Sequence, residues 1–167
     1  MSLSEPIAAE LQREAATTRR MLERVPQDSL AWKPHEKSMT LGRLAGHIAE
    51  LPSLVIPTLT SDELNFAAGS FQPFAPSNTA ELLEKFDKNI AEAVGALKDQ
   101  PDEHLLKTWR LRNGEQVFFE LPRVSVLRTM ALNHVIHHRG QLSVYLRLLG
   151  VPLPSVYGPT ADEAPTS

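Results

Sequence analysis

Three of the six histidines in this sequence fall within five residues, at positions 134, 137 and 138. Apart from them, residues 132–141 have the pattern of a buried amphipathic helix. Burying an imidazole there costs free energy unless its ring nitrogens have a bonding partner. At about 100° per residue, His134 and His138 straddle the centre of the apolar stripe, whereas His137 lies on its edge at about −60°. We therefore expect His134 and His138 to point inward, one turn apart.

Two histidines four residues apart on one helical face can bind the same divalent cation. The alternative is a pair of core histidines whose ring nitrogens are satisfied by hydrogen bonds. A third ligand would decide between them, and His47 is the candidate because it lies near the inward edge of a second helical stripe. Alone it would more often be a satisfied core histidine, but beside an inward pair the ligand role is favoured.

Three histidines are the set found in catalytic zinc sites, which keep an open coordination position for water or substrate. A closed structural site would want four ligands. The sequence has no cysteine, so thiolate ligands, disulfides and cysteine nucleophiles are excluded. Histidine ligands must be deprotonated, so metal affinity is expected to fall as the pH drops through about 6.5.

Four further residues close to these histidines in sequence have expected roles. Glu50, one turn after the helix-two histidine, is a weak candidate for a general base, although a carboxylate that is solvated or supports a ligand is favoured. His137 could line a pocket mouth or bond a neighbouring helix. Gln141, at about −20° from His134, could orient a ligand, whereas Arg139, at about 140°, faces away and is expected to be structural or interfacial. The other two histidines, His35 and His104, are expected at the surface.

Helical periodicity and capping residues predict the elements that position these side chains. Pro52 should kink the second helix or end it near Leu51. Glycine at position 140 suggests a close approach of helices. Four helices are predicted. The first begins at Ser4 and ends at Pro26, and the second begins at Leu41. The third begins at Ser77 and ends before Pro101, and the fourth runs unbroken from Pro122 to Gly150.

Two connections differ from simple loops. Residues 57–79 form a connection that is long for a compact domain. It could run the length of a bundle, so that the second and third helices are parallel. Residues 107–111 and 116–120, joined through Asn113 and Gly114, predict a short β-hairpin before the last helix. We expect one domain over residues 1–159 and a loose polar tail over residues 160–167.

Composition narrows the class of protein. At 167 residues, 42% hydrophobic and 22% charged, the chain has the composition of an ordinary soluble domain. A net charge of −3 and a pI near 6.1 argue against nucleic-acid or anionic-membrane binding. Without a signal-peptide pattern or an apolar run of about 18 residues, a cytoplasmic location is the simplest expectation.

Residues 32–51 (WKPHEKSMTLGRLAGHIAEL), the N-H-x-x-H-H-R-G-Q run at 133–141 and the later Tyr157-Gly158-Pro159 resemble the DinB/YfiT-like family. The similarity covers nearly the whole chain in the expected order. It implies an all-α, up-down-down-up four-helix bundle, often a homodimer, with one divalent metal per chain. By position the implied ligands are His47, His134 and His138, and the metals that the resemblance implies are zinc, nickel or iron.

Related proteins include bacillithiol transferases and mycothiol-dependent enzymes, which use the metal to bind or activate a low-molecular-weight thiol. The resemblance therefore implies a metal-dependent hydrolase or thiol S-transferase acting on a small molecule. The alternative is a metal-binding stress or interaction protein without turnover. Beyond Glu50, no residue outside the histidines is placed as a general base.

Overall fold

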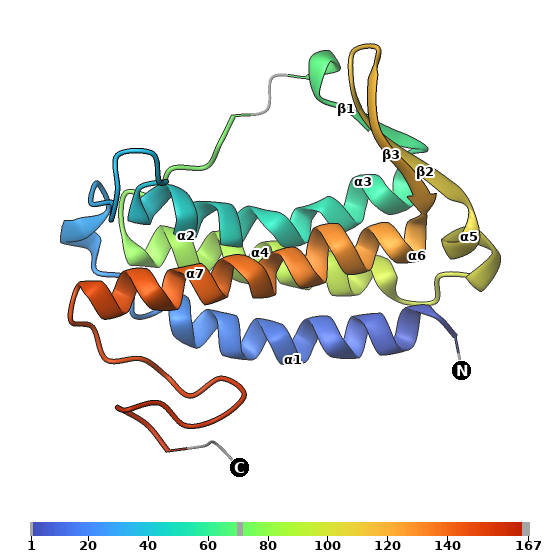
Figure 1. The fold of residues 1–167 in the computed structure, drawn as a ribbon. Coiled ribbons are helices and arrows are strands. Elements are labelled where there is room, and N and C mark those ends of the chain that lie inside the picture. Colours follow the sequence, from blue (N-terminus) through green and yellow to red (C-terminus); the bar gives the residue numbers. More distant parts are fainter. Residues whose placement is uncertain (1, 70–71, 165–167) are drawn as a thin grey trace.

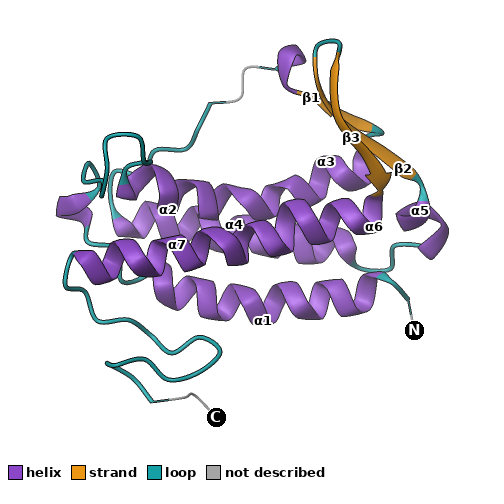
Figure 2. Ribbon diagram, in the orientation of Figure 1, coloured by secondary structure: helices purple, strands orange, loops and turns teal. Residues whose placement is uncertain are grey.

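The computed structural model describes residues 2–69 and 72–164. Long helical segments run side by side, and a small sheet lies across one end of them (Figures 1 and 2). The α-helices are α1 (Ser4–Leu22), α2 (Leu41–Glu50), α3 (Val55–Thr60), α4 (Thr79–Leu97), α5 (Asp102–Leu106), α6 (Arg123–Val126) and α7 (His134–Leu148). Tighter or wider turns form η1 (Gln27–Ser29), η2 (Leu51–Leu54), η3 (Phe66–Ala68) and the π-helical η4 (Leu127–Asn133). The strands are β1 (Glu63–Asn65), β2 (Thr108–Asn113) and β3 (Gln116–Pro122).

The helix starts differ by a residue or two from the predicted ones. Ser4 is buried in the first turn of α1 and does not cap it. Ser2 Oγ instead accepts a hydrogen bond from the Glu5 N–H at 3.4 Å. Similarly, α4 is capped by Asn78, whose Oδ1 accepts from the Glu81 N–H at 2.9 Å, and not by Ser77. An amide oxygen can satisfy the free N–H groups of a first turn as well as a hydroxyl.

The second helical segment changes to a 3₁₀ turn at Pro52 but does not stop there. The α-helical turns of α2 end at Glu50, Pro52 lies in the first turn of the 3₁₀ segment η2, and α3 continues to Thr60. A proline is tolerated where its missing N–H would have no partner in the helix. We predicted that the long connection begins at Pro57. It begins instead at Ser61, after the end of α3.

The predicted hairpin is confirmed, and a third strand joins it. Strands β2 and β3 pair antiparallel, while β1 from the long connection pairs parallel to β2 with Leu64 opposite Leu111. Gly114 adopts a φ of +58° in the hairpin turn, a conformation that glycine takes without strain. The connection then returns along the molecule, so that α2 and α4 run in the same direction (Figure 1). A purely all-α description is therefore wrong in detail: the fold is mostly helical with a small mixed sheet.

The last helical segment is not regular throughout. Between α6 and α7 the chain makes π-helical turns over η4, which ends one residue before His134. Such wide turns often occur next to functional sites. The predicted close approach at Gly140 is wrong, because a Cβ there would meet nothing within 4 Å. The close approach occurs at Gly46, where a Cβ would lie 2.5 Å from the carbonyl oxygen of Phe74.

The apolar core fixes α2 against α7. It fills the space between α1, α2, α4 and α7, and its largest fully buried members include Leu44, Ile48 and Phe86. Leu142 and Leu146 of α7 belong to the same cluster. Removing one such leucine typically costs about 2–5 kcal/mol of stability. This packing holds the histidine-bearing faces of α2 and α7 next to each other.

The C-terminal residues are bonded to the body of the protein where the structure describes them. Asp162 pairs with Arg147, and Glu163 pairs with Arg20. The predicted loose tail is thus held at these positions, while residues 165–167 lie outside the described part of the chain. Among the described residues, no helix is long and apolar enough to span a membrane.

Candidate metal centre

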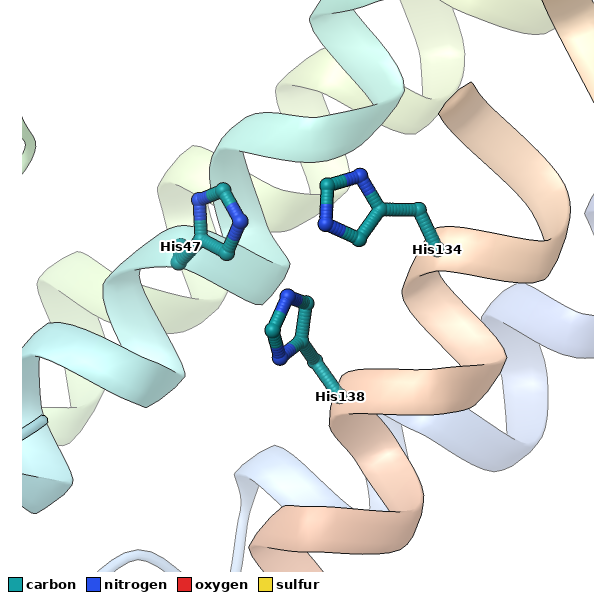
Figure 3. Close-up of side chains that lie close together, drawn as sticks. All are labelled: His47, His134 and His138. Atoms are coloured by element: carbon teal, nitrogen blue, oxygen red, sulfur yellow. The ribbon is translucent and has the colours of Figure 1, made fainter. Parts of the chain in front are cut away.

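His47, His134 and His138 converge on one point. His47 comes from α2, and the other two come from successive turns of α7. Figure 3 shows the three rings gathered around a common space between the two helices. One ring nitrogen from each residue lies within 4.8 Å of the other two. This is the set that helical phase and family resemblance both indicated, and it could hold a metal ion.

The three rings are neutral at physiological pH. Burial lowers the pKa of His47 to about 4, with additional lowering by His138, His134 and the Arg43 cation. Burial is also the main cause of the lowered pKa values of His134 and His138. Neutral imidazoles present lone pairs, as metal ligation requires. The expected loss of metal affinity near pH 6.5 is therefore shifted to lower pH.

Gln141 fixes the orientation of His138. Its Oε1 lies 2.7 Å from Nδ1 of His138 and can only accept a hydrogen bond, so Nδ1 carries the proton. The Nε2 atom of His138 is then the nitrogen with the free lone pair. The predicted role of Gln141 in orienting a ligand fits this contact, although Gln141 itself is exposed.

An ion pair supports His47 from behind. Arg43 Nη1 donates to Glu50 Oε2 at 3.0 Å, and Arg43 Nη2 lies 3.4 Å from Nδ1 of His47. The other carboxylate oxygen of Glu50 accepts a hydrogen bond from the backbone N–H of Phe74. Glu50 is only 8% exposed and both its oxygens are engaged, which fits a supporting carboxylate better than a free base. Its Oε2 lies 3.8 Å from Nδ1 of His47.

Arg43 was missed by sequence reasoning. A signal for it existed, because residues 43, 47 and 50 are spaced four and three apart and so share one helical face. The partner of this face, the backbone of residue 74 in the long connection, could not be inferred from spacing.

A pocket of about 390 Å³ opens beside the histidines. His47, Glu50 and His134 contribute to its lining, together with Ser53 from η2 and Asn65 from β1. Most of the other walls are apolar, from Leu51, Leu54, Pro57, Leu64, Phe66 and Met130. The walls supplied by β1 and η3 were not predicted, since nothing in the sequence placed the long connection over this face.

The remaining histidines lie outside the cluster. His137 is exposed, and its Nε2 lies 3.2 Å from Nε2 of Gln141. His35 is exposed, as expected. His104 is half-buried, contrary to the expectation, because its Nε2 lies 2.8 Å from the carbonyl oxygen of Leu59 and so ties α5 to the end of α3.

Arg139 is structural, on the face of α7 opposite to the ligands. Its guanidinium lies 2.7 Å from Oε2 of Glu14, 3.1 Å from Oγ1 of Thr18 and 2.9 Å from the hydroxyl of Tyr157. Burial is the main cause of the raised pKa of Tyr157. These contacts tie α7 to α1 and to the C-terminal segment.

The described residues thus form a mostly helical protein in which α2 and α7 present three neutral imidazoles beside an apolar pocket. The chain belongs to the DinB family, which matches residues 1–166. It is 28% identical over 150 residues to the uncharacterized protein YrdA of Bacillus subtilis (strain 168), covering 90% of this chain and 85% of YrdA. It is 30% identical over 139 residues to the uncharacterized protein YjoA of the same organism, covering 80% and 82% of the two chains.

Solved structures have the same fold. A DinB-like protein from Bacillus cereus ATCC 10987 is 26% identical, with a TM-score of 0.71 over 92% of this chain and 97% of its own. The DinB-like YjoA of Bacillus subtilis has a TM-score of 0.66 over 95% and 99% of the two chains, at 20% identity. The latter likeness concerns the fold alone.

Proposed function

We propose that this chain binds one divalent metal ion, zinc, nickel or iron, through His47, His134 and His138, and uses it as a hydrolase or low-molecular-weight-thiol S-transferase. One observation carries the proposal: three neutral imidazoles converge at the end of a pocket large enough for a small molecule. A bound ion with three protein ligands would act as a Lewis acid on a water or thiol at its open position.

The chain's own residues have separate tasks in this proposal. Gln141 holds His138 in the tautomer that leaves Nε2 free. The Arg43–Glu50 pair keeps α2 and the long connection in register behind His47. The apolar walls exclude water from the side of the site that faces the pocket, which strengthens electrostatic interactions there.

The proposed architecture is the family's up-down-down-up four-helix bundle. Its four helical paths would be α1, α2 with α3, α4, and α6 with α7, and their directions in Figure 1 support that order. We also propose that the chain forms a homodimer, as family members often do.

The first test of the proposed function measures the metal content of the purified protein. Protein purified without a nickel column should contain about one first-row metal ion per chain, because all-imidazole sites bind these ions well. A chain that remains metal-free after incubation with zinc, nickel and iron salts would remove the premise.

Turnover is tested next, on the metal-loaded protein. Thiol-plus-electrophile pairs assay the transferase, and ester and amide substrates assay the hydrolase. Activity should be lost in His138→Ala and retained in His35→Ala, whose side chain is exposed and does not belong to the converging group. Metal binding without turnover on any of these substrates would favour the alternative, a non-catalytic metal-binding protein.

A further inference from the structure

The pocket beside the histidines has an unusual distribution of polarity. Its polar groups at the histidine end are His47, Glu50 and His134, whereas apolar side chains from η2, α3, β1, η3 and η4 make up most of the rest. Among the described residues that line it, there is no lysine or arginine. A ligand in this pocket therefore meets metal-binding groups at one end and hydrocarbon along its body.

The other polar side chains in the lining are already engaged. Ser53 Oγ donates to the carbonyl oxygen of Glu50 at 2.7 Å. Asn65 Oδ1 accepts hydrogen bonds from the backbone N–H groups of Ala67 and Gly114 at 3.1 and 3.0 Å. Glu50 is paired with Arg43, so this guanidinium is already engaged and does not offer a free cation to a ligand. An anionic group placed among the apolar walls would lose its hydration without gaining a cationic partner.

We propose that the substrate is a compact, uncharged apolar molecule, an alkyl or aryl group with one metal-binding donor such as a thiol. This inference rests on the proposed function, because it takes the three histidines to hold the metal that the donor would bind. The volume of about 390 Å³ is within the range of small-molecule sites. Thiols that carry carboxylates along their length would be poor ligands, because the walls offer those groups no partner.

The test compares two thiols that differ by one para carboxylate. Protein loaded with cobalt(II) is titrated with benzyl mercaptan and with para-carboxybenzyl mercaptan, whose carboxylate is too far from the sulfur to chelate the metal. Thiolate binding is followed by the change in the visible spectrum of cobalt. We expect the uncharged thiol to bind at least about tenfold more tightly, since only the carboxylate must be desolvated without a partner.

Variants locate this preference in the pocket. Met130→Lys places a cation among the walls, so the charged thiol should gain affinity and the preference should shrink or reverse. Phe66→Lys is a second variant at a 43% exposed position, where we expect the change to leave the fold intact. Leu106→Lys is the matched control, because Leu106 is 59% exposed on α5 and does not line the pocket. Circular dichroism checks that each variant is folded.

Failure of the metal site and failure of the pocket are separable. If cobalt does not bind, the proposed function fails. The pocket is then judged by the neutral dye N-phenylnaphthylamine, whose fluorescence should rise saturably with metal-free protein and much less with Met130→Lys. If cobalt binds but the charged thiol matches or exceeds the uncharged one, the metal site stands and the inference about the substrate is overturned. A dye response equal in wild type and Met130→Lys also overturns it.

Discussion

Gln141 accepts a hydrogen bond from Nδ1 of His138 at 2.7 Å, three residues earlier in α7. The contact selects one tautomer and directs Nε2 of His138 toward the ring nitrogens of His47 and His134 (Figure 3). Groups that hold a metal ligand in this way commonly contribute to metal affinity without touching the metal.

Gln141→Leu should weaken zinc binding by about tenfold, since it keeps the size of the side chain but removes the acceptor for His138. Isothermal titration calorimetry measures the effect. Gln100→Leu is the control, because the side chain of Gln100 donates to the backbone carbonyl of Ala96 near the end of α4, away from the histidines in sequence. Equal zinc affinity for wild type and Gln141→Leu would show that His138 needs no partner.

The ligand set is tested by single alanine substitutions. His47→Ala, His134→Ala and His138→Ala should each weaken metal binding by at least about a hundredfold, since each removes one of three imidazoles. His137→Ala should have a much smaller effect, because His137 is exposed and its ring nitrogens are not among those that converge on the site, although its ring packs against His138. Competition with a chromogenic chelator gives the affinities. Loss of binding in His137→Ala with retention in His138→Ala would reassign the site to a pair three residues apart.

Acid should destabilise the metal-free protein before most carboxylates titrate. Because the pKa of His47 is about 4 in the folded chain and ordinary when unfolded, the unfolded state binds more protons between these values. The stability present above about pH 6.5 is therefore lost progressively as the pH falls toward 4. Urea unfolding at about pH 7.5 and about pH 5.5 measures this.

A matched variant tests whether His47 causes the dependence of stability on pH. His47→Gln cannot be protonated, so its free energy of unfolding should change less between the two pH values. His134 and His138 have pKa values lowered in the same direction and should retain part of the dependence. Higher stability of the wild type at the lower pH would refute the argument.

Arg139→Ala should lower the free energy of unfolding by about 3 kcal/mol, because it leaves the Glu14 carboxylate in a largely buried site without its cationic partner, with only the Tyr157 hydroxyl still donating to it. Arg19→Ala is the control: its pair with Asp87 is exposed, so the loss should be below about 1 kcal/mol. Urea denaturation followed by circular dichroism compares the two. A smaller loss for Arg139→Ala than for Arg19→Ala would contradict the structural role of this contact.

The proposed homodimer gives a fifth prediction. Val144 and Leu148, one turn apart on α7, are 58% and 62% exposed, and exposed apolar side chains of this kind favour association. Sedimentation of the wild type at tens of micromolar should show a dimer, and Val144→Glu with Leu148→Glu should shift it toward monomer. A wild-type protein that sediments only as a monomer would refute the proposal.

The sequence determined those features of the site that depend on short-range geometry. The helical repeat placed His134 and His138 on one face and Arg139 on the other, because an α-helix fixes the angle between residues a few positions apart. The hairpin of β2 and β3 followed from a local turn at Asn113 and Gly114 in the same way.

The tertiary structure decided what depends on distant partners. Sequence could nominate His47 but not measure its approach to α7, which the packing of Leu44 and Ile48 sets. The parallel pairing of β1 with β2, the backbone partner of Glu50 and the apolar wall at Phe66 join segments far apart in the chain. Local patterns do not encode such contacts, because they form only when the whole core has packed.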